Sequence, residues 1–180
     1  MADKTSMRGV FLLAGLLLLA FWGCSGPTAA ARGIQPAAKP AVEAALQAFA
    51  AELVQQGEEI KPDAVYTLLK GYLARNPGIY GAALAFAPVE KNGRTVKTAP
   101  YVYRSGVLFM EKNLYKNYDY SLPSCLWYAE PVQKGRPVWS APYFDRGGGE
   151  TWMITYSIPI YTPVPEARLI GVVTSDVQIK

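Results

Sequence analysis

Two long β-rich segments near the end of the chain constrain its fold more than any other feature. Residues 151–161 and 168–177 are rich in β-branched and aromatic residues, and a proline-bearing turn separates them. Such a pair predicts an antiparallel hairpin with a long loop. Strand side chains alternate between the two faces of a sheet. The second segment is therefore expected to place four side chains on one face: Ile170, Val172, Thr174 and Asp176.

Asp176 would then end a mostly apolar strand face. A carboxylate there is costly to bury unless a cation or a hydrogen-bond donor meets it. The segment leading into the hairpin carries a second carboxylate, Asp145, and the three glycines at 147–149 predict a loop. Asp145 and Asp176 could therefore converge on a shared partner, which makes them the sharpest local indication of a site.

Two amphipathic helices are predicted upstream, between residues 41 and 78. Apolar residues recur every three or four positions over 42–53 and again over 65–73. Pro62 suits the first turn of the second helix, and Asn-Pro-Gly at 76–78 ends it.

The rest of the chain favours strands. Asn-Gly at 92–93 is a turn dipeptide, and residues 112–123 look irregular. Three segments are candidate strands: 79–87, 99–104 and 107–111. With the closing hairpin we expect an α+β fold, in which an N-terminal helix pair packs on a five- to six-stranded antiparallel sheet.

Residues 1–24 predict a targeting segment. Lys4 and Arg8 flank an apolar run over 10–22, and a Gly-Cys pair ends it at Cys24. As a helix this run reaches about 20 Å, short of the roughly 30 Å of a hydrocarbon core. It is typical of a secretory signal. The Gly-Cys pair resembles a bacterial lipobox, in which Cys24 would be lipidated; an ordinary signal peptide and an uncleaved anchor stay open.

Residues 25–40 predict a disordered tether, because their Ala, Pro and Gly cannot bury enough apolar surface to order themselves. Residues 41–180 then form the folded domain. All three interpretations of the first segment export that domain, so we expect it on the periplasmic side of a bacterial membrane, held there by the lipid on Cys24.

Most enzyme and nucleic-acid classes are disfavoured. The chain has no histidine, which excludes Ser-His-Asp and Cys-His catalysis and HExxH zinc sites. Its net charge of +4 is scattered, whereas nucleic-acid binding needs a basic patch. Cys125 is the only cysteine besides Cys24, so no disulfide framework is expected. We expect no catalytic residue, cofactor or metal.

Residues 41–180 resemble the Cache (PDC-like) family, the extracytoplasmic sensor domains of bacterial chemoreceptors and histidine kinases. The resemblance implies a Cache/PAS-like fold and a small-molecule ligand. It rests on five stretches of the sequence: Trp139 with Pro142-Tyr143-Phe144-Asp145, Tyr156-Ser157-Ile158-Pro159-Ile160, Gly171-Val172-Val173 with Asp176, Leu126-Trp127-Tyr128, and residues 76–83.

The resemblance also implies roles for particular residues. Tyr143, Asp145 and Asp176 match the family positions that hold the amino group of an amino-acid ligand, and Trp127 and Tyr128 match its aromatic pair. Aromatic faces and carboxylates both suit an ammonium group.

The family's carboxylate-binding arginine is missing. Its place, two residues before Trp127, holds Cys125, and a thiol cannot pair with a carboxylate. The predicted ligand is therefore amino-acid-like, and we favour an amine without a carboxylate. Arg104 or Arg136 could still supply the missing charge.

Because the sequence ends at Lys180 without an output module, we expect the domain to act through a separate membrane-bound signalling protein. Two other classes stay open. One is a structural envelope lipoprotein without a small ligand, and the other is a hydrolase that uses Asp145 and Asp176.

Overall fold

The computed structural model describes residues 38–56 and 60–179. The predicted signal segment 1–24, its lipidation candidate Cys24 and residues 25–37 of the predicted tether lie outside this range. Within the described ranges, no helix combines the length and apolar character needed to cross a membrane.

Two N-terminal helices form as the apolar periodicity predicts. They are α1 (Ala38–Gln56) and α2 (Pro62–Arg75). Helix α1 begins three residues before the expected start at Ala41, so the end of the predicted tether is helical. Pro40 is tolerated there, because the first turn of a helix leaves its N–H groups without intrahelical partners.

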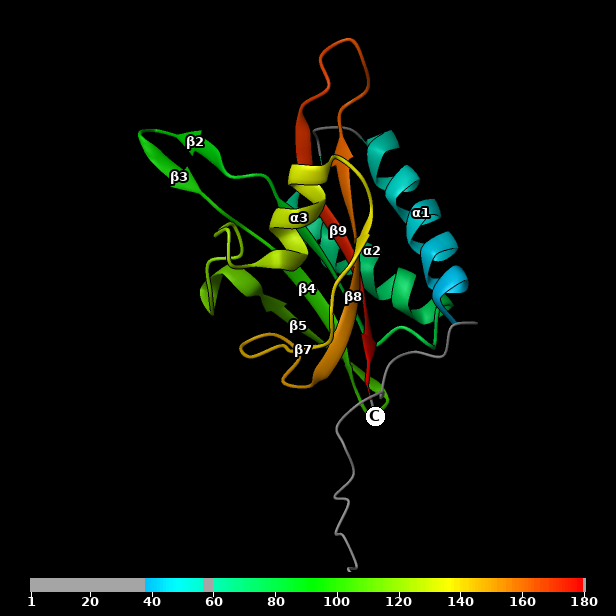
Figure 1. Cartoon of the computed structure of the whole chain (residues 1–180). Coiled ribbons are helices and arrows are strands. Elements are labelled where there is room, and N and C mark those ends of the chain that lie inside the picture. Colours follow the sequence, from blue (N-terminus) through cyan, green and yellow to red (C-terminus); the bar gives the residue numbers. More distant parts are fainter. Residues whose placement is uncertain (1–37, 57–59, 180) are drawn as a thin grey trace, which may run out of the picture. The chain divides into compact units, whose positions relative to one another are not determined.

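One antiparallel sheet carries the domain, which confirms the α+β class (Figure 1). Its main path runs β5-β4-β1-β9-β8-β6, and the short strand β7 also pairs with β8. The seven strands are β1 (Gly81–Phe86), β4 (Pro100–Ser105), β5 (Leu108–Asn113), β6 (Val138–Trp139), β7 (Tyr143–Phe144), β8 (Trp152–Tyr161) and β9 (Leu169–Gln178). The predicted closing hairpin is β8–β9.

The predicted Asn-Gly turn joins a separate two-stranded hairpin, β2 (Val89–Lys91) and β3 (Arg94–Val96). Irregular residues 112–123 include one short 3-10 helix, η2 (Leu114–Lys116).

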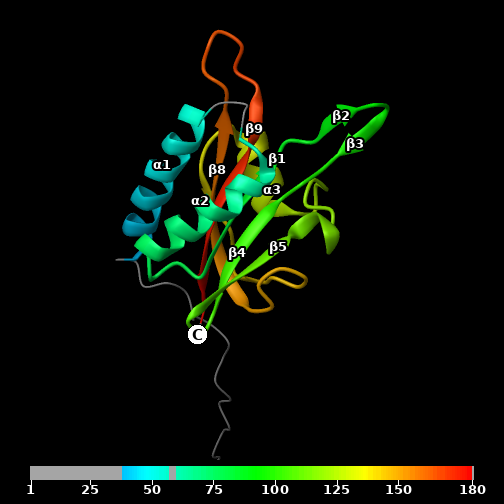
Figure 2. The ribbon, with the colours of Figure 1, turned by 180° about the vertical axis from the view of Figure 1, so that it is seen from behind.

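Helices α1 and α2 cover one face of the sheet, and Figure 2 shows the domain from their side. The core between these layers includes seven fully buried apolar residues: Leu46, Leu53, Val65, Leu69, Leu84, Val102 and Val173.

Helix α3 (Leu126–Lys134) lies on the opposite face, against β6, β8 and β9 (Figure 1). The sequence analysis assigned no helix here. Its nine residues are few, and Pro131 inside the helix removes one backbone donor, so the sequence does not favour a helix at this place.

One face assignment on β9 was wrong. Val172 packs on the α3 side, but Ile170 packs against the core under α1 and α2. The pairing register shifts between Ile160 and Tyr161, so that Tyr161 pairs with Leu169 and Ile170 is skipped. A bulge of this kind reverses the face to which the following side chains point.

Gly171 marks the closest approach of β9 to β1 and gives a test of this packing. A Cβ at Gly171 would lie 2.3 Å from the Ala85 carbonyl oxygen, inside contact distance with backbone that cannot rotate away. We expect Gly171→Ala to lower the free energy of unfolding by about 3 kcal/mol in urea denaturation. Gly78→Ala is the matched control, because a Cβ there meets no atom within 4 Å. Equal stability of the two variants would contradict this packing.

Candidate functional site

The sheet face under α3 carries a row of polar side chains in its centre. Thr155 and Ser157 of β8 pair with Asp176 and Thr174 of β9, so all four point to the same side. All four are buried. Buried polar groups need partners. The hydrogen bonds described below involve Thr155, Thr174 and Asp176, whereas Ser157 Oγ has none within the described ranges.

Asp176 ends a chain of hydrogen bonds. The Thr155 hydroxyl donates to Asp176 Oδ1 at 2.8 Å, and the Tyr143 hydroxyl lies 2.8 Å from the same threonine oxygen. Because the single hydroxyl hydrogen of Thr155 goes to the carboxylate, Tyr143 must be the donor to Thr155. The chain therefore joins three segments at Asp176.

The ionised form of Asp176 is disfavoured. The side chain is 4% exposed. Burial raises the pKa of Asp176 to about 7, the nearby Asp145 charge adds to this, and the hydrogen bond from Thr155 opposes it. A cation at this place would favour the ionised form.

Asp145 is held by the glycine-rich loop that follows it. The Gly149 N–H donates to Asp145 Oδ2 at 2.7 Å. Gly148 must lack a side chain, since a Cβ there would lie 2.1 Å from that oxygen. Lys112 fixes the loop by donating to the Gly148 carbonyl at 2.6 Å. Burial raises the pKa of Asp145, and the Gly149 N–H partly offsets the rise.

Two cavities lie beside these carboxylates, and Asp145 lines both. The inner cavity holds about 10 Å³ and is lined by both aspartates. The outer pocket holds about 400 Å³, and it lies between α3 and the segment leading into β7. Both are lined by the same four side chains: Tyr118, Trp127, Tyr143 and Asp145. A ligand body in the outer pocket could thus present a small head group to the inner cavity.

Two buried side-chain oxygens in the described part of the chain lack a hydrogen-bond partner, and each lies at one of these cavities. They are the Tyr101 hydroxyl at the inner cavity and Ser157 Oγ at the outer pocket. The Tyr101 hydroxyl approaches Asp176 without the geometry of a full hydrogen bond, and this weak donor interaction lowers the pKa of the carboxyl. An unpaired buried hydroxyl costs about 1–3 kcal/mol, which a ligand group can recover.

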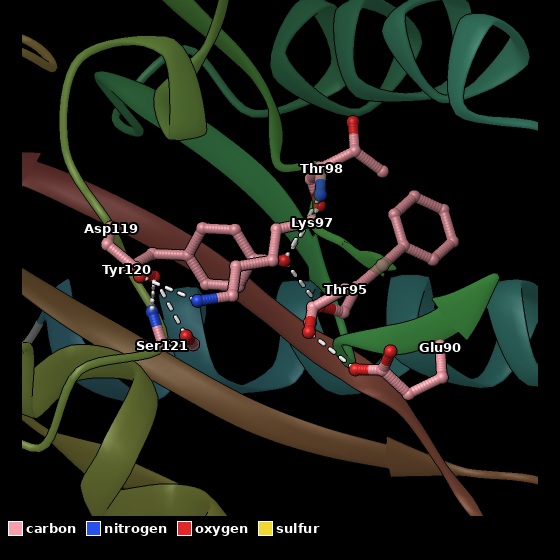
Figure 3. A network of polar contacts seen from close by, with 8 residues as sticks. Glu90, Thr95, Lys97, Thr98, Asp119, Tyr120 and Ser121 are labelled. Carbon is pink, nitrogen blue, oxygen red and sulfur yellow. Dashed lines mark hydrogen bonds and ion pairs between the residues drawn. The ribbon is translucent and has the colours of Figure 1, made fainter. Parts of the chain in front are cut away.

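Tyr120 supports Trp127, which lines the inner cavity. The Tyr120 hydroxyl donates to the Phe86 carbonyl at 2.7 Å and accepts from the Thr98 N–H at 3.2 Å (Figure 3). The Tyr120 ring centroid lies 6.4 Å from that of Trp127 and 5.1 Å from that of Tyr128. The surface pair Lys97–Asp119, with a 2.6 Å contact, fixes the same segment from outside.

The five predicted ligand-binding residues fall into three groups. Trp127, Tyr143 and Asp145 line both cavities, and Asp176 lines the inner one. Tyr128 lines neither, because its ring packs edge-on against Tyr120 in the core.

The predicted alternatives for the missing positive charge also have definite positions. The Arg104 guanidinium donates to backbone carbonyls at the end of α2, including Ile79 O at 2.9 Å, and it does not line either cavity. Arg136 lines neither cavity as well. Arg146, which the sequence analysis did not single out, lies exposed at the outer pocket. Cys125 lines that pocket, and burial raises its thiol pKa to about 12.

Sequence reasoning missed four side chains of this site. They are Tyr101 and Tyr118, which line the inner cavity, Thr155, which hydrogen-bonds to Asp176, and Ser157, which lines the outer pocket. For the last two, the register of the closing hairpin would have been the signal, since it pairs Thr155 with Asp176. The seven-residue loop at 162–168 leaves that register undetermined in the sequence.

Comparison with known proteins places this fold. Residues 65–180 match the family model "Methyl-accepting chemotaxis protein-like, first PDC sensor domain". No curated protein sequence matches the chain. Among solved structures, it is similar to the extracellular domain of soHK1S-Z6, which is described as a histidine kinase, with 30% identity over 78% of this chain and 54% of that one and a TM-score of 0.65.

Two further structures share the fold at lower identity. Methyl-accepting chemotaxis protein X has 19% identity and a TM-score of 0.53, over 78% of this chain and 59% of that one. The ligand-binding domain of the Pseudomonas aeruginosa amino-acid chemoreceptor PctC, in complex with GABA, has 16% identity and a TM-score of 0.52, over 79% and 57%. The chain thus spans less than two thirds of the length of each of the three.

The family match covers more than half of the chain, and the fold agrees with it, so the predicted resemblance is confirmed. The chain belongs to the family of PDC (Cache) sensor domains found in chemoreceptors and histidine kinases.

Proposed function

We propose that this domain senses a small amine that lacks an α-carboxylate, and that it binds this ligand without chemical turnover. The observation that carries the proposal is the inner cavity. Two buried aspartates line it, and no lysine or arginine does. A cationic ligand would supply the missing counter-charge.

An ammonium group fits this cavity in size and in chemistry. A volume of about 10 Å³ accommodates one water-sized group. Asp145 and Asp176 offer carboxylate acceptors, and the hydroxyl of Tyr101 is free to accept as well. The ring of Trp127 at the same cavity favours a cation.

Cys125 supports the choice of an amine over an α-amino acid. The thiol lines the outer pocket at the position where the resemblance expects the carboxylate-binding arginine, and its raised pKa keeps it uncharged. A protein with this fold, PctC, is seen in complex with GABA. That complex supports the binding of a small molecule by this fold.

We also propose that the domain is exported and held at the membrane through Cys24, and that it acts on a separate membrane signalling protein. The family match supports export, because the family comprises sensor domains of chemotaxis proteins. The Gly-Cys pair that ends the apolar run of the first segment is the support for the anchor.

Binding should depend on both aspartates. We expect a primary amine such as phenethylamine to raise the melting temperature of the purified protein. Asp176→Asn and Asp145→Asn should each weaken its affinity by about tenfold to a hundredfold, as for the loss of a hydrogen bond to a charged group. Asp63→Asn, at an exposed position in α2, is the control that keeps full affinity. Undiminished affinity in both site variants would refute the amine site.

Stability and affinity should respond to pH in opposite directions. The folded-state pKa of Asp176, about 7, exceeds its unfolded value of about 3.9, so the protonated carboxyl favours folding. Stability of the ligand-free domain therefore falls as pH rises from about 4 to about 7. Amine affinity rises around pH 7, because an ammonium needs the ionised carboxylate. Melting curves with and without amine test both trends, and Asp176→Asn should flatten them. Amine affinity that falls as pH rises through 7 would count against the proposal.

Restoring the missing positive charge should change the selectivity. L-phenylalanine differs from phenethylamine only by its α-carboxylate. We expect the wild type to prefer the amine, and Cys125→Arg to gain affinity for the amino acid, because a guanidinium binds a carboxylate with two hydrogen bonds. Cys125→Leu controls for added bulk. A wild type that already prefers phenylalanine would sink the proposed selectivity.

A further inference from the structure

We propose that Ser157 is the second polar contact of the ligand, so that the ligand is an amine whose apolar body carries a neutral hydroxyl about 7 Å from its nitrogen. This inference rests on the proposed amine-binding function. It adds a second subsite, in the outer pocket, to the one formed by the aspartates.

Ser157 is a buried polar group that the protein leaves unused. The side chain is 1% exposed, Oγ has no hydrogen-bond partner, and the residue lines the outer pocket. Its polar neighbours on the same face are satisfied. Thr155 bonds to Asp176, and the Thr174 hydroxyl accepts from the Ala83 N–H at 3.1 Å.

In the described residues no protein group hydrogen-bonds to Ser157 Oγ. Across the sheet Ser157 pairs with Thr174 on β9 and with Val138 on β6. The Thr174 hydroxyl accepts from the Ala83 N–H instead, and valine has no polar side-chain atom. Because Ser157 lines the outer pocket, a pocket occupant is a partner that its position allows.

The strand geometry sets the spacing between the two subsites. Thr155 touches Asp176, and Ser157 is two residues further along β8 on the same face. Two residues in an antiparallel strand span about 7 Å. A ligand whose ammonium lies beside Asp176 therefore reaches Ser157 with a group about that far from the nitrogen.

The second group should be neutral. Ser157 is buried, and an ion beside it would need a charged partner to offset its desolvation. The charged side chains that line the outer pocket are Glu130, Asp145 and Arg146. Arg146 is exposed, Glu130 is paired with Lys134 at 2.5 Å, and Asp145 is assigned to the ammonium group. A hydroxyl or phenol meets Ser157 without that cost. Between the two subsites the walls are mostly apolar, with Trp127, Pro131, Val138 and Pro142.

Two matched pairs of amines test the inference by calorimetric titration. Tyramine differs from phenethylamine by one hydroxyl, and 5-amino-1-pentanol differs from pentylamine in the same way. We expect wild-type protein to bind the hydroxylated member of at least one pair about tenfold more tightly, as one buried hydrogen bond provides. Ser157→Ala should remove that preference and leave the affinity for the plain amine unchanged. Ser124→Ala, at an exposed position of the same pocket, should keep the preference.

The outcomes separate this inference from the function on which it rests. If the plain amines bind but neither hydroxyl improves affinity, or if Ser157→Ala keeps the preference, the role of Ser157 is refuted and the amine site stands. If none of the four amines binds, the amine function itself is refuted. The wild-type comparison needs no variant, so the absence of a preference refutes the inference even if Ser157→Ala fails to fold.

Discussion

The buried carboxylate of Asp176 is the interaction on which the arrangement of this domain depends. Its strand, β9, lies inside the sheet between β1 and β8, and the side chain is 4% exposed. Burial of a carboxylate is tolerated where hydrogen bonds meet it and where protonation remains available. Thr155 provides the hydrogen bond, and the raised pKa of Asp176 keeps protonation of its carboxyl available. Asp145 adds a second acid nearby, so each carboxylate makes ionisation of the other less favourable. A cation that binds between them relieves both penalties.

Adjacent residues of β9 connect the two layers of the domain. Asp176 faces the cavities, and Ser175 faces the helices, where its hydroxyl lies 2.6 Å from that of Tyr72 on α2. The Tyr72 ring in turn stacks on Phe49 of α1, with centroids 4.6 Å apart. A displacement of β9 at Asp176 would therefore also disturb the contact of the adjacent Ser175 with the helix pair. Figure 2 shows β9 passing behind α2 at the centre of this layer. The site is thus built into the core of the sheet, which keeps its geometry fixed.

Much of the fold follows from the sequence pattern, whereas the site follows only in part. Apolar periodicity indicates α1 and α2, and β-branched runs indicate β8 and β9, because burial of those faces selects one period. Asp145 and Asp176 could be singled out because acids are unfavourable in apolar strands. No residue type at this place predicts the bulge that turns Ile170 to the helix side. Whether Trp127 or Tyr128 lines the cavity depends on the rotation of α3 about its own axis. The sequence does not specify that rotation.

The unpaired oxygens argue that the domain is adapted to an occupant rather than to an empty core. A structural protein can replace a buried serine by alanine and gain stability, since an unmade hydrogen bond costs about 1–3 kcal/mol. Here Tyr101 and Ser157 both retain such oxygens, and each lies at a cavity beside the aspartates. Two unpaired hydroxyls and two buried carboxyls with raised pKa values, all on one face of the sheet, are unfavourable in the absence of a ligand. A molecule with a cationic end and a polar group would satisfy all four groups. Its binding would recover the free energy that these groups cost the ligand-free fold.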